Sequence, residues 1–369
     1  MNIVITGGGT GGHVNPGLAI ADTVRKHDGT AKISFVGTSH GIENKLVPKA
    51  GYDLYHVEIT GLRRKFTLEN LKTLYLTVTS VSKAKKLLKK LGCNVVFATG
   101  GYVCYPVAKA AHKLHIPIVL HEANAIPGVA VKMLERYADT VYVNFEESKK
   151  YLKYPQKAIR VGNPIIGDIC AENRDAIRKE LGIGTKYEKM LLSFGGSMGA
   201  QQLNFAVLKL MRDYSKKHPE ILHVHATGSI EYEVDKKLFA EYSLSECENI
   251  KLLEYIYDMP QKMAAADLVI CRAGSMTLSE LERNAKPSVL IPSPNVTNNH
   301  QFKNATVLSN ADAAVVIEEK DLDSEALTKA VDQLLSNGQK LKQMSENALK
   351  FAVWDTNEVI YKRLAELAK

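Results

Sequence analysis

The stretch Ile5-Thr6-Gly7-Gly8-Gly9-Thr10-Gly11-Gly12-His13 decides how the chain begins to fold. It follows an apolar run typical of a β-strand and precedes a helical pattern. A second stretch, Ser193-Phe194-Gly195-Gly196-Ser197-Met198-Gly199-Ala200, has the same position after residues 190–192. A glycine-rich turn between strand and helix lets the backbone approach a ligand closely, and it directs the free N–H groups of a helix N-terminus toward that ligand. The two stretches therefore predict two α/β domains, each with a loop suited to an anion.

Composition indicates a globular chain long enough for two domains. The 369 residues are 45% hydrophobic and 24% charged, values ordinary for such proteins. No run of eighteen apolar residues could span a bilayer, and the first residues resemble a strand more than a signal peptide. The five cysteines are odd in number and include no C-x-x-C pair, which is against a disulfide or zinc framework. We expect a cytoplasmic protein with free, mostly buried thiols.

Strand-like and helix-like segments alternate along the whole chain, as in βαβ units around a parallel sheet. The expected strands are residues 3–5, 33–36, 54–57, 95–98, 118–120 and 140–143, then 190–193, 222–226, 250–252, 268–270, 288–291 and 314–317. Residues 161–167, rich in glycine and proline, are the expected hinge. The predicted fold class is α/β, with two doubly wound parallel-sheet domains whose ligands lie at the carboxyl ends of the strands. A last helical pattern follows Asp355, a candidate N-cap.

The first glycine loop satisfies the G-x-G-x-x-G spacing, which is a weak signal by itself. A dinucleotide site would carry an acidic residue at the end of the second strand, where the sequence reads Phe35-Val36-Gly37-Thr38-Ser39. This counts against NAD and an adenosyl cofactor. A Walker loop would have lysine after the last glycine, where His13 stands. A turn that serves packing alone is the plain alternative, but the loop holds more glycine than a turn needs, so we favour ligand contact.

His13 is a candidate general base, because it follows the loop directly and imidazole titrates near neutral pH. A structural or solvated histidine is the alternative, and the sequence leaves both open.

The second loop offers successive backbone N–H groups and the Ser197 hydroxyl, which suit a diphosphate and can offset charge on a leaving diphosphate. A further strand, turn and helix start follow in Cys271-Arg272-Ala273-Gly274-Ser275-Met276-Thr277-Leu278-Ser279-Glu280. The Glu280 carboxylate can accept two hydrogen bonds from a ribose diol. Because Ser-x-x-Glu is also a common helix-capping pattern, both interpretations of Glu280 stay open.

A possible metal-binding triplet, Asp321-Leu322-Asp323, precedes a helix start and lies far along the chain from every glycine loop. We interpret it as helix capping. No metal site or cofactor is predicted.

Basic residues concentrate in residues 62–90, which contain nine Lys and Arg and one acidic residue, Glu69. The net charge of this segment is therefore +8, equal to that of the whole chain. Residues 68–91 show a helical pattern with lysines toward its end. The plain interpretation is an amphipathic helix with a solvated basic face. The functional alternative is a peripheral site for an anionic partner, such as a membrane leaflet. A nucleic-acid partner is not expected, because aromatic residues are few and no recognisable module is present.

Taken together, the ordered motifs resemble the MurG family of bacterial transferases. The motifs are Thr6–His13, Thr99-Gly100-Gly101-Tyr102-Val103, His121-Glu122-x-Asn124, Pro127-Gly128, Gly162-Asn163-Pro164, Gly195-Gly196-Ser197-x-Gly199-Ala200, Arg272-Ala273-Gly274 with Thr277-x-Ser279-Glu280, and His300-Gln301-x-x-Asn304-Ala305. Each motif is modest, whereas their order and spacing from residue 3 to about 305 are specific. The resemblance implies transfer of N-acetylglucosamine from UDP-GlcNAc to lipid I, giving lipid II for peptidoglycan at the cytoplasmic face of the membrane. Because such a polyprenyl acceptor must be reached at the bilayer, we favour an anionic membrane leaflet as the partner of residues 62–90.

The resemblance also implies a GT-B fold with an interdomain cleft and an inverting, metal-independent reaction. Residues 1–164 would form the acceptor and membrane-facing domain, residues 165–344 the UDP-GlcNAc domain, and a helix at about 345–369 would pack back on the first. His13 is the favoured base, with Glu122 as an alternative. The implied substrate-binding residues are Thr10, Gly11, Gly12, Asn124, Ser197, Ile256, Arg272, Ser275, Met276, Thr277, Leu278, Ser279, Glu280 and Gln301.

Three departures from the family pattern concern the ligand loops. Ile165 and Ile166 stand where many members have an arginine, and Arg272 could supply some of that charge. Ala123 replaces a usual glutamine, and Cys104 and Tyr105 replace smaller residues. Two other functions stay open at this point: a UDP-GlcNAc 2-epimerase on the same fold, and a non-catalytic sensor of nucleotide sugars.

Overall fold

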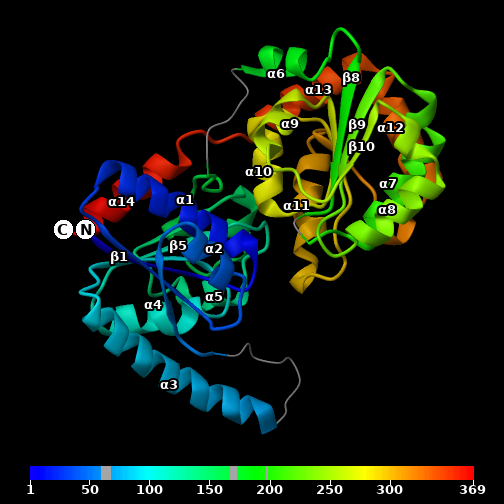
Figure 1. The fold of residues 1–369 in the computed structure, drawn as a ribbon. Coiled ribbons are helices and arrows are strands. Elements are labelled where there is room, and N and C mark those ends of the chain that lie inside the picture. Colours follow the sequence, from blue (N-terminus) through cyan, green and yellow to red (C-terminus); the bar gives the residue numbers. More distant parts are fainter. Residues whose placement is uncertain (60–67, 167–172, 197) are drawn as a thin grey trace. The chain divides into compact units, whose positions relative to one another are not determined.

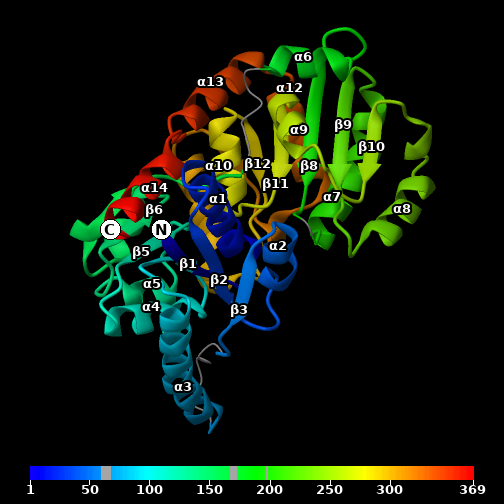
Figure 2. The same ribbon diagram turned by 60° about the vertical axis from the view of Figure 1, so that its left-hand side comes forward.

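The computed structural model describes residues 1–59, 68–166, 173–196 and 198–369. The chain splits into two compact units (Figures 1 and 2). Unit 1 comprises Met1–Gly167 and Val353–Lys369, and unit 2 comprises Asp168–Ala352. Each unit is an α/β layer structure around its own parallel sheet, which confirms the predicted fold class.

Unit 1 contains a seven-stranded parallel sheet in the order β3-β2-β1-β4-β5-β6-β7. The strands are β1 (Asn2–Gly7), β2 (Lys32–Gly37), β3 (Asp53–His56), β4 (Val95–Gly100), β5 (Ile118–Glu122), β6 (Thr140–Val143) and β7 (Ala158–Arg160). The first six confirm the predicted strands. The edge strand β7 was not predicted, because three residues with an exposed Ile159 and a terminal arginine give no apolar run.

Two apolar cores cover the two faces of this sheet, since side chains alternate along each strand. On one face Ile3 and Ile5 pack with α1 (Gly11–His27), α2 (Glu43–Lys49) and α14 (Thr356–Leu367). On the other face Val4 packs with α3 (Leu68–Lys90), α4 (Cys104–Lys113) and α5 (Val129–Leu134). The last helix, α14, thus returns to unit 1, against α1.

Unit 2 contains a six-stranded parallel sheet in the order β10-β9-β8-β11-β12-β13. The strands are β8 (Lys189–Phe194), β9 (Ile221–Ala226), β10 (Ile250–Leu253), β11 (Leu268–Cys271), β12 (Ser288–Leu290) and β13 (Ala314–Val316), all six as predicted. The helices are α6 (Arg174–Glu180), α7 (Gln201–Asp213), α8 (Tyr232–Glu241), α9 (Met259–Ala265), α10 (Ser275–Arg283), α11 (His300–Ser309), α12 (Ser324–Leu335) and α13 (Gly338–Leu349).

Short 3-10 helices complete the chain at Glu146–Tyr151, Pro155–Lys157, Ser215–Lys217, Leu244–Glu246, Thr297–Asn299 and Glu319–Asp321. Asp323 is the N-cap of α12, and its side chain accepts a hydrogen bond from the Ala326 amide at 2.7 Å. This confirms that the Asp-x-Asp triplet is used for capping. In the described part of the chain, no helix is long and apolar enough to cross a membrane.

Each sheet has one point at which the chain reverses its direction of winding. In unit 1 this point lies between β1 and β4, and in unit 2 between β8 and β11. Open α/β sheets bind ligands at the carboxyl ends of the strands that flank such a point. Both predicted glycine loops begin there, because the first follows β1 and the second follows β8.

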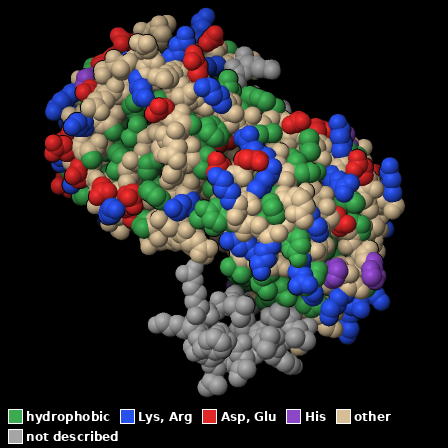
Figure 3. All heavy atoms as spheres, turned by 180° about the vertical axis from the view of Figure 1, so that it is seen from behind, with side chains coloured by type: hydrophobic (Ala, Val, Ile, Leu, Met, Phe, Trp, Pro, Cys, Tyr) green, Lys and Arg blue, Asp and Glu red, His purple; other side chains and the backbone are tan. Residues whose placement is uncertain are grey.

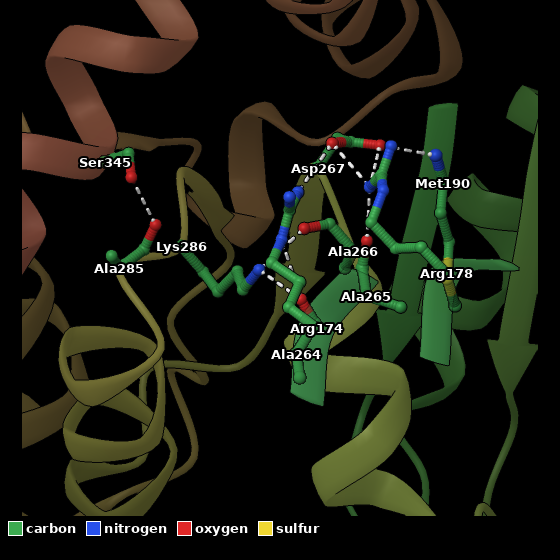
Figure 4. A network of polar contacts seen from close by, with 10 residues as sticks. All are labelled: Arg174, Arg178, Met190, Ala264, Ala265, Ala266, Asp267, Ala285, Lys286 and Ser345. Carbon is green, nitrogen blue, oxygen red and sulfur yellow. Dashed lines mark hydrogen bonds and ion pairs between the residues drawn. The ribbon is translucent and has the colours of Figure 1, made fainter. Parts of the chain in front are cut away.

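A charged cluster fixes α6 to the opposite end of the unit 2 sheet (Figure 4). Asp267 precedes β11 and accepts hydrogen bonds from Arg174, Arg178 and the Met190 amide, at 3.2, 2.8 and 2.8 Å. Lys286 donates to the carbonyls of Ala264 and Ala266 at 2.7 and 2.9 Å, and burial lowers its pKa to about 7. This cluster lies at the amino ends of the strands, so we interpret it as structural.

Candidate functional site

The glycines of the first loop divide into those that serve packing and those that face open space. A Cβ atom on Gly7 would lie 2.0 Å from the Thr99 hydroxyl, and one on Gly8 would lie 2.6 Å from the Glu43 carboxylate. Gly9 has a φ of +86°, and no atom lies within 4 Å of its Cβ position. For Gly11 and for Gly12, the atom nearest to the Cβ position is 3.8 Å away. The packing interpretation therefore explains Gly7 and Gly8, while Gly9, Gly11 and Gly12 leave room for a ligand.

The N-terminus of α1 lies at the same open part of the loop. Thr10 is its N-cap and is exposed, and its carbonyl accepts hydrogen bonds from the amides of His13 and Val14. The half-buried Gly11 and Gly12 belong to the first turn, whose N–H groups have no carbonyl one turn earlier. These residues provide a positive dipole end next to His13.

The imidazole of His13 is oriented by the loop itself. Its Nδ1 lies 3.0 Å from the Gly8 carbonyl and 3.3 Å from the Thr10 hydroxyl. Because a carbonyl can only accept, Nδ1 carries the proton and Nε2 is the basic nitrogen. The other edge of the ring lies against Gly100, where a Cβ atom would be 2.9 Å from Nε2. The carbonyl of His13 accepts from Thr99 Oγ1 at 2.6 Å, which joins the first turn of α1 to the end of β4.

Glu122, the alternative base, anchors a neighbouring loop. It ends β5 and is buried, with one oxygen accepting from the Asn124 amide at 2.9 Å and the other from the Gly128 amide at 2.7 Å. The Asn124 side chain also donates to it, at 3.2 Å. Burial raises the pKa of Glu122, although these hydrogen bonds oppose the shift. Both carboxylate oxygens of Glu122 are therefore engaged in holding the loop of residues 123–128.

Glu43, at the start of α2, is a residue of this site that the sequence analysis missed. Its buried carboxylate accepts from the Gly9 amide at 3.0 Å and from the Thr38 amide and hydroxyl, both at 2.9 Å. It therefore joins the loops that follow β1 and β2. The only available sequence signal was a lone acid shortly after Gly37 and Gly41, a pattern too common to single out.

The second glycine loop is packed against the loop that follows β9. A Cβ atom on Gly199, whose φ is +91°, would lie 2.2 Å from the Thr227 carbonyl. The side-chain amide of Asn204, in α7, donates a hydrogen bond to the same carbonyl at 2.8 Å. Gly196 has a φ of +102° with no atom within 4 Å of its Cβ position, so open space lies beside it. The predicted diphosphate ligand Ser197 is outside the described residues.

Helix α10 presents only some of the predicted ligand residues. Gly274 is its N-cap, and Met276, Thr277 and Glu280 are half-buried. Ser275, Leu278 and Ser279 are buried, and the Leu278 amide donates within the helix to the Gly274 carbonyl. Side-chain contacts with a ligand are therefore open to Met276, Thr277 and Glu280, while the others face the protein interior.

Glu280 lies in the second turn of α10, beyond the position that a helix-capping glutamate occupies. Burial raises its pKa to about 7. In the described part of the chain its carboxylate accepts no hydrogen bond. A carboxylate that is desolvated without protein donors is suited to accept hydrogen bonds from a ligand hydroxyl.

Ile256 lies in the loop between β10 and α9, and its side chain is buried. Within the described residues its backbone N–H and C=O form no hydrogen bond. An amide edge of this kind, at the carboxyl end of a strand, can pair with the edge of a nucleobase. The exposed Tyr255 and Tyr257, whose ring centroids are 5.0 Å apart, flank it.

Arg272 follows β11 and is bound to another side chain. It donates to the Ile291 carbonyl at 3.1 Å and forms an ion pair with Glu319. Gln301 of α11 accepts a hydrogen bond from the Ser293 amide at 2.8 Å. Of these groups, Glu319 also lines a pocket of about 470 Å³, together with Gln202, Pro292, Pro294, Asn299, Phe302, Glu318 and Lys320. An anionic ligand that binds Arg272 therefore has to compete with the Glu319 carboxylate for the guanidinium group.

The predicted basic helix is present as α3, and its residues 79–90 have described side chains. Val81, Ala84 and Leu88 are buried against α4, whereas Lys83, Lys86, Lys89 and Lys90 are exposed. Arg63, Arg64 and Lys65 lie outside the described residues. The described half of α3 is therefore amphipathic. On the face of the molecule drawn in Figure 3, Lys and Arg side chains (blue) are scattered among hydrophobic (green) and acidic (red) ones.

Two Rossmann-like units with glycine loops at their switch points define the GT-B class of glycosyltransferase folds. The chain belongs to glycosyltransferase family 28, whose N-terminal domain matches residues 3–143 and whose C-terminal domain matches residues 190–360, and within it to the MurG family.

Curated relatives cover the whole chain. The UDP-N-acetylglucosamine--N-acetylmuramyl-(pentapeptide) pyrophosphoryl-undecaprenol N-acetylglucosamine transferase of Acetivibrio thermocellus is 39% identical over 100% of this chain and 99% of its own. The enzyme of the same name from Ruminiclostridium cellulolyticum is 40% identical over 100% of both chains.

Solved structures agree with this assignment. The MurG of Acinetobacter baumannii has a TM-score of 0.78 and 25% identity over 99% of both chains. The UDP-GlcNAc 2-epimerase of Neisseria meningitidis, bound to UDP-GlcNAc, has a TM-score of 0.66 and 16% identity over 99% of this chain and 100% of its own, a likeness of fold alone.

Proposed function

We propose that this chain transfers N-acetylglucosamine from UDP-GlcNAc to the C4 hydroxyl of the muramic acid of lipid I, forming lipid II for peptidoglycan. The observation that carries the proposal is full-length similarity, at about 40% identity, to relatives named for this reaction. The reaction inverts the anomeric configuration and needs no metal. The acceptor oxygen attacks the anomeric carbon, its proton passes to a base, and the bond to UDP breaks.

Unit 1 supplies the base in this proposal. His13 takes the C4 hydroxyl proton on Nε2, since Nδ1 is held as N–H by the Gly8 carbonyl. Thr10, Gly11 and Gly12 border the reacting sugar from the open part of the loop, and Asn124 holds a sugar hydroxyl. A base held by the backbone on one nitrogen keeps a fixed direction during proton transfer.

Unit 2 holds the donor. Gly196, Ser197 and the N-terminus of α10 receive the diphosphate, whose growing negative charge is offset by amide dipoles. Glu280 accepts from the ribose diol, Ile256 pairs with the uracil, and Gln301 contacts the sugar. This role of Glu280 is supported by its half-buried carboxylate, which accepts no hydrogen bond from the described residues and whose pKa burial raises to about 7.

Transfer of label from UDP-GlcNAc to a short-chain lipid I analogue tests the function directly. Labelled disaccharide lipid is the expected product. Labelled UDP-ManNAc would instead indicate an epimerase, and binding without turnover would indicate a sensor.

A prediction concerns His13. Replacement of His13 with alanine should lower kcat by about 10²- to 10⁴-fold, the usual contribution of a general base, while UDP binding stays nearly unchanged. Calorimetry of UDP binding checks the second part. Turnover equal to that of the wild type would remove His13 from the role of base.

The proposed location is the cytoplasmic face of the membrane, with α3 as a peripheral contact to anionic lipid. The exposed lysines at its end support this, because each basic residue near such a surface contributes about 1 kcal/mol. Replacing Lys86, Lys89 and Lys90 with glutamate should reduce co-sedimentation with phosphatidylglycerol vesicles. The matched control replaces Lys236 and Lys237 of α8, also exposed, and should leave binding unchanged.

A further inference from the structure

A single peptide group joins Glu43 to His13. The N–H of Gly9 donates to Glu43 Oε2 at 3.0 Å. The C=O of Gly8, at the other end of the same peptide, lies 3.0 Å from His13 Nδ1. The carboxylate and the imidazole are thus bound to opposite ends of one polarisable dipole.

The Glu43 carboxylate is ionised at neutral pH. Burial raises its pKa, but hydrogen bonds from the backbone of Gly9 and Thr38 and from the Thr38 hydroxyl outweigh burial, so that the net shift is downward. A buried charge with several donors is held firmly in one geometry.

The surrounding loops are shaped around this carboxylate. A Cβ atom would lie 2.6 Å from a Glu43 carboxylate oxygen at Gly8, 2.6 Å from its Cγ at Gly37 and 2.0 Å from a carboxylate oxygen at Gly41. Three glycines, one at the end of β2 and one in each of the loops that follow β1 and β2, therefore leave room for the same side chain. This steric observation is independent of the hydrogen bonds, and it shows that the surrounding backbone is shaped to accommodate the Glu43 carboxylate.

We propose that Glu43 is a positioning residue for His13 and acts through the Gly8–Gly9 peptide. Its negative charge at the N–H end makes the carbonyl at the other end a stronger acceptor, because hydrogen bonds in series polarise one another. The stronger carbonyl keeps the proton on Nδ1 and increases the basicity of Nε2. The inference rests on the proposed function where it concerns catalysis.

Other titratable groups surround the pair. His121 of β5 is buried, and both burial and the charge of His13 lower its pKa, to about 4. The Cys104 thiol contacts the Gly100 backbone, and burial raises its pKa to about 12. His56 is bound to Asn44, next to Glu43, at 2.8 Å. Neither His121 nor Cys104 changes charge near pH 7.

Nitrogen NMR of the histidine side chains in the whole protein tests the link without using activity. In the wild type, His13 is expected as the Nδ1–H tautomer at neutral pH. Glu43→Gln retains the size of the side chain. Its NH₂ group cannot accept a hydrogen bond, so either the Gly9 or the Thr38 amide faces a second donor. We expect this variant to lower the His13 pKa by about one unit and to weaken the tautomer preference. A wild-type His13 in the Nε2–H form would overturn the proposal even if the variant failed to fold.

Kinetics give the second readout. Glu43→Gln should lower kcat about tenfold or more, leave KM for UDP-GlcNAc within about twofold, and move the acidic limb of the kcat/KM profile to lower pH. Glu43→Asp retains the charge and should recover part of both the tautomer preference and kcat.

Glu135→Gln is the matched control. Glu135 is another buried carboxylate of unit 1, and it accepts from the amides of Lys153 and Tyr154 at 3.0 and 2.9 Å. Its replacement should lower stability and leave the pH profile unchanged. An unaltered His13 pKa and pH profile in Glu43→Gln would overturn the proposal. Failure of the proposed function would appear separately, as absence of label transfer by the wild type.

Discussion

Two carboxylates, Glu43 and Glu280, show how surroundings decide the charge of a side chain. Both are withdrawn from water, which raises a carboxyl pKa. At Glu43 the loop amides outweigh that effect, and the net pKa is lowered. At Glu280 no donor among the described residues compensates, and the pKa rises to about 7. Glu43 is therefore suited to holding structure, and Glu280 to receiving a ligand.

The first residue-scale prediction concerns the pH dependence of donor binding. If the ionised Glu280 accepts hydrogen bonds from the ribose diol, affinity for UDP should rise with pH up to about 7. Below that pH, the affinity should fall about tenfold for each pH unit. Between pH 4.5 and 7 the folded state holds a proton that the unfolded chain has lost, so Glu280 lowers stability as pH rises through that range. Calorimetric titration with UDP at several pH values checks the prediction. Glu280→Gln should abolish this dependence, and an unchanged profile would contradict the assigned role.

The second prediction concerns Glu319, which neutralises Arg272. Glu319→Gln should lower KM for UDP-GlcNAc by roughly three- to tenfold, since relieving competition for one hydrogen bond to a charged group is worth about 1 kcal/mol. Glu318→Gln is the control, because Glu318 pairs with the exposed Lys320 instead. A higher KM in the Glu319 variant alone would mean that Glu319 holds Arg272 in its binding position.

At the scale of elements, α14 packs against β1 and α1, which lie at the opposite end of the sequence. Ile360 and Leu364 are buried in the core that contains β1 and α1, and His27 of α1 stacks on Tyr361. A helix of twelve residues is marginal by itself, so its order depends on this burial.

Leu364→Ala should therefore reduce the free energy of unfolding by about 2–5 kcal/mol, the range for deleting a buried leucine. Urea titration followed by circular dichroism measures it. Lys362→Ala on the exposed side of the same helix is the control, expected to change stability by less than about 0.5 kcal/mol. Equal effects of the two substitutions would show that α14 is not held by its apolar side.

Most elements could be predicted from sequence because each central strand is an apolar run buried on both faces, as residues 95–98 are. The exposed edge strand β7 lacks that signal. The sequence also could not distinguish Gly7, which packs on Thr99, from Gly9, which faces open space. That distinction, like the joining of Glu43 to His13, arises from contacts between loops far apart in the chain.

For the whole molecule, each sheet brings its own glycine loop to its own switch point. The charges differ between the two sites. The unit 1 site has a histidine oriented by the backbone, and the unit 2 site has helix N-termini with a desolvated carboxylate. This asymmetry supports the proposal that unit 1 supplies the base and binds the acceptor, while unit 2 binds the nucleotide.

Hydrogen–deuterium exchange of the whole protein with and without UDP tests this assignment most directly. We expect slower exchange in residues 195–200, 254–258 and 274–280, with little change in residues 7–13. Protection centred on residues 7–13, with none in the three segments of unit 2, would contradict it.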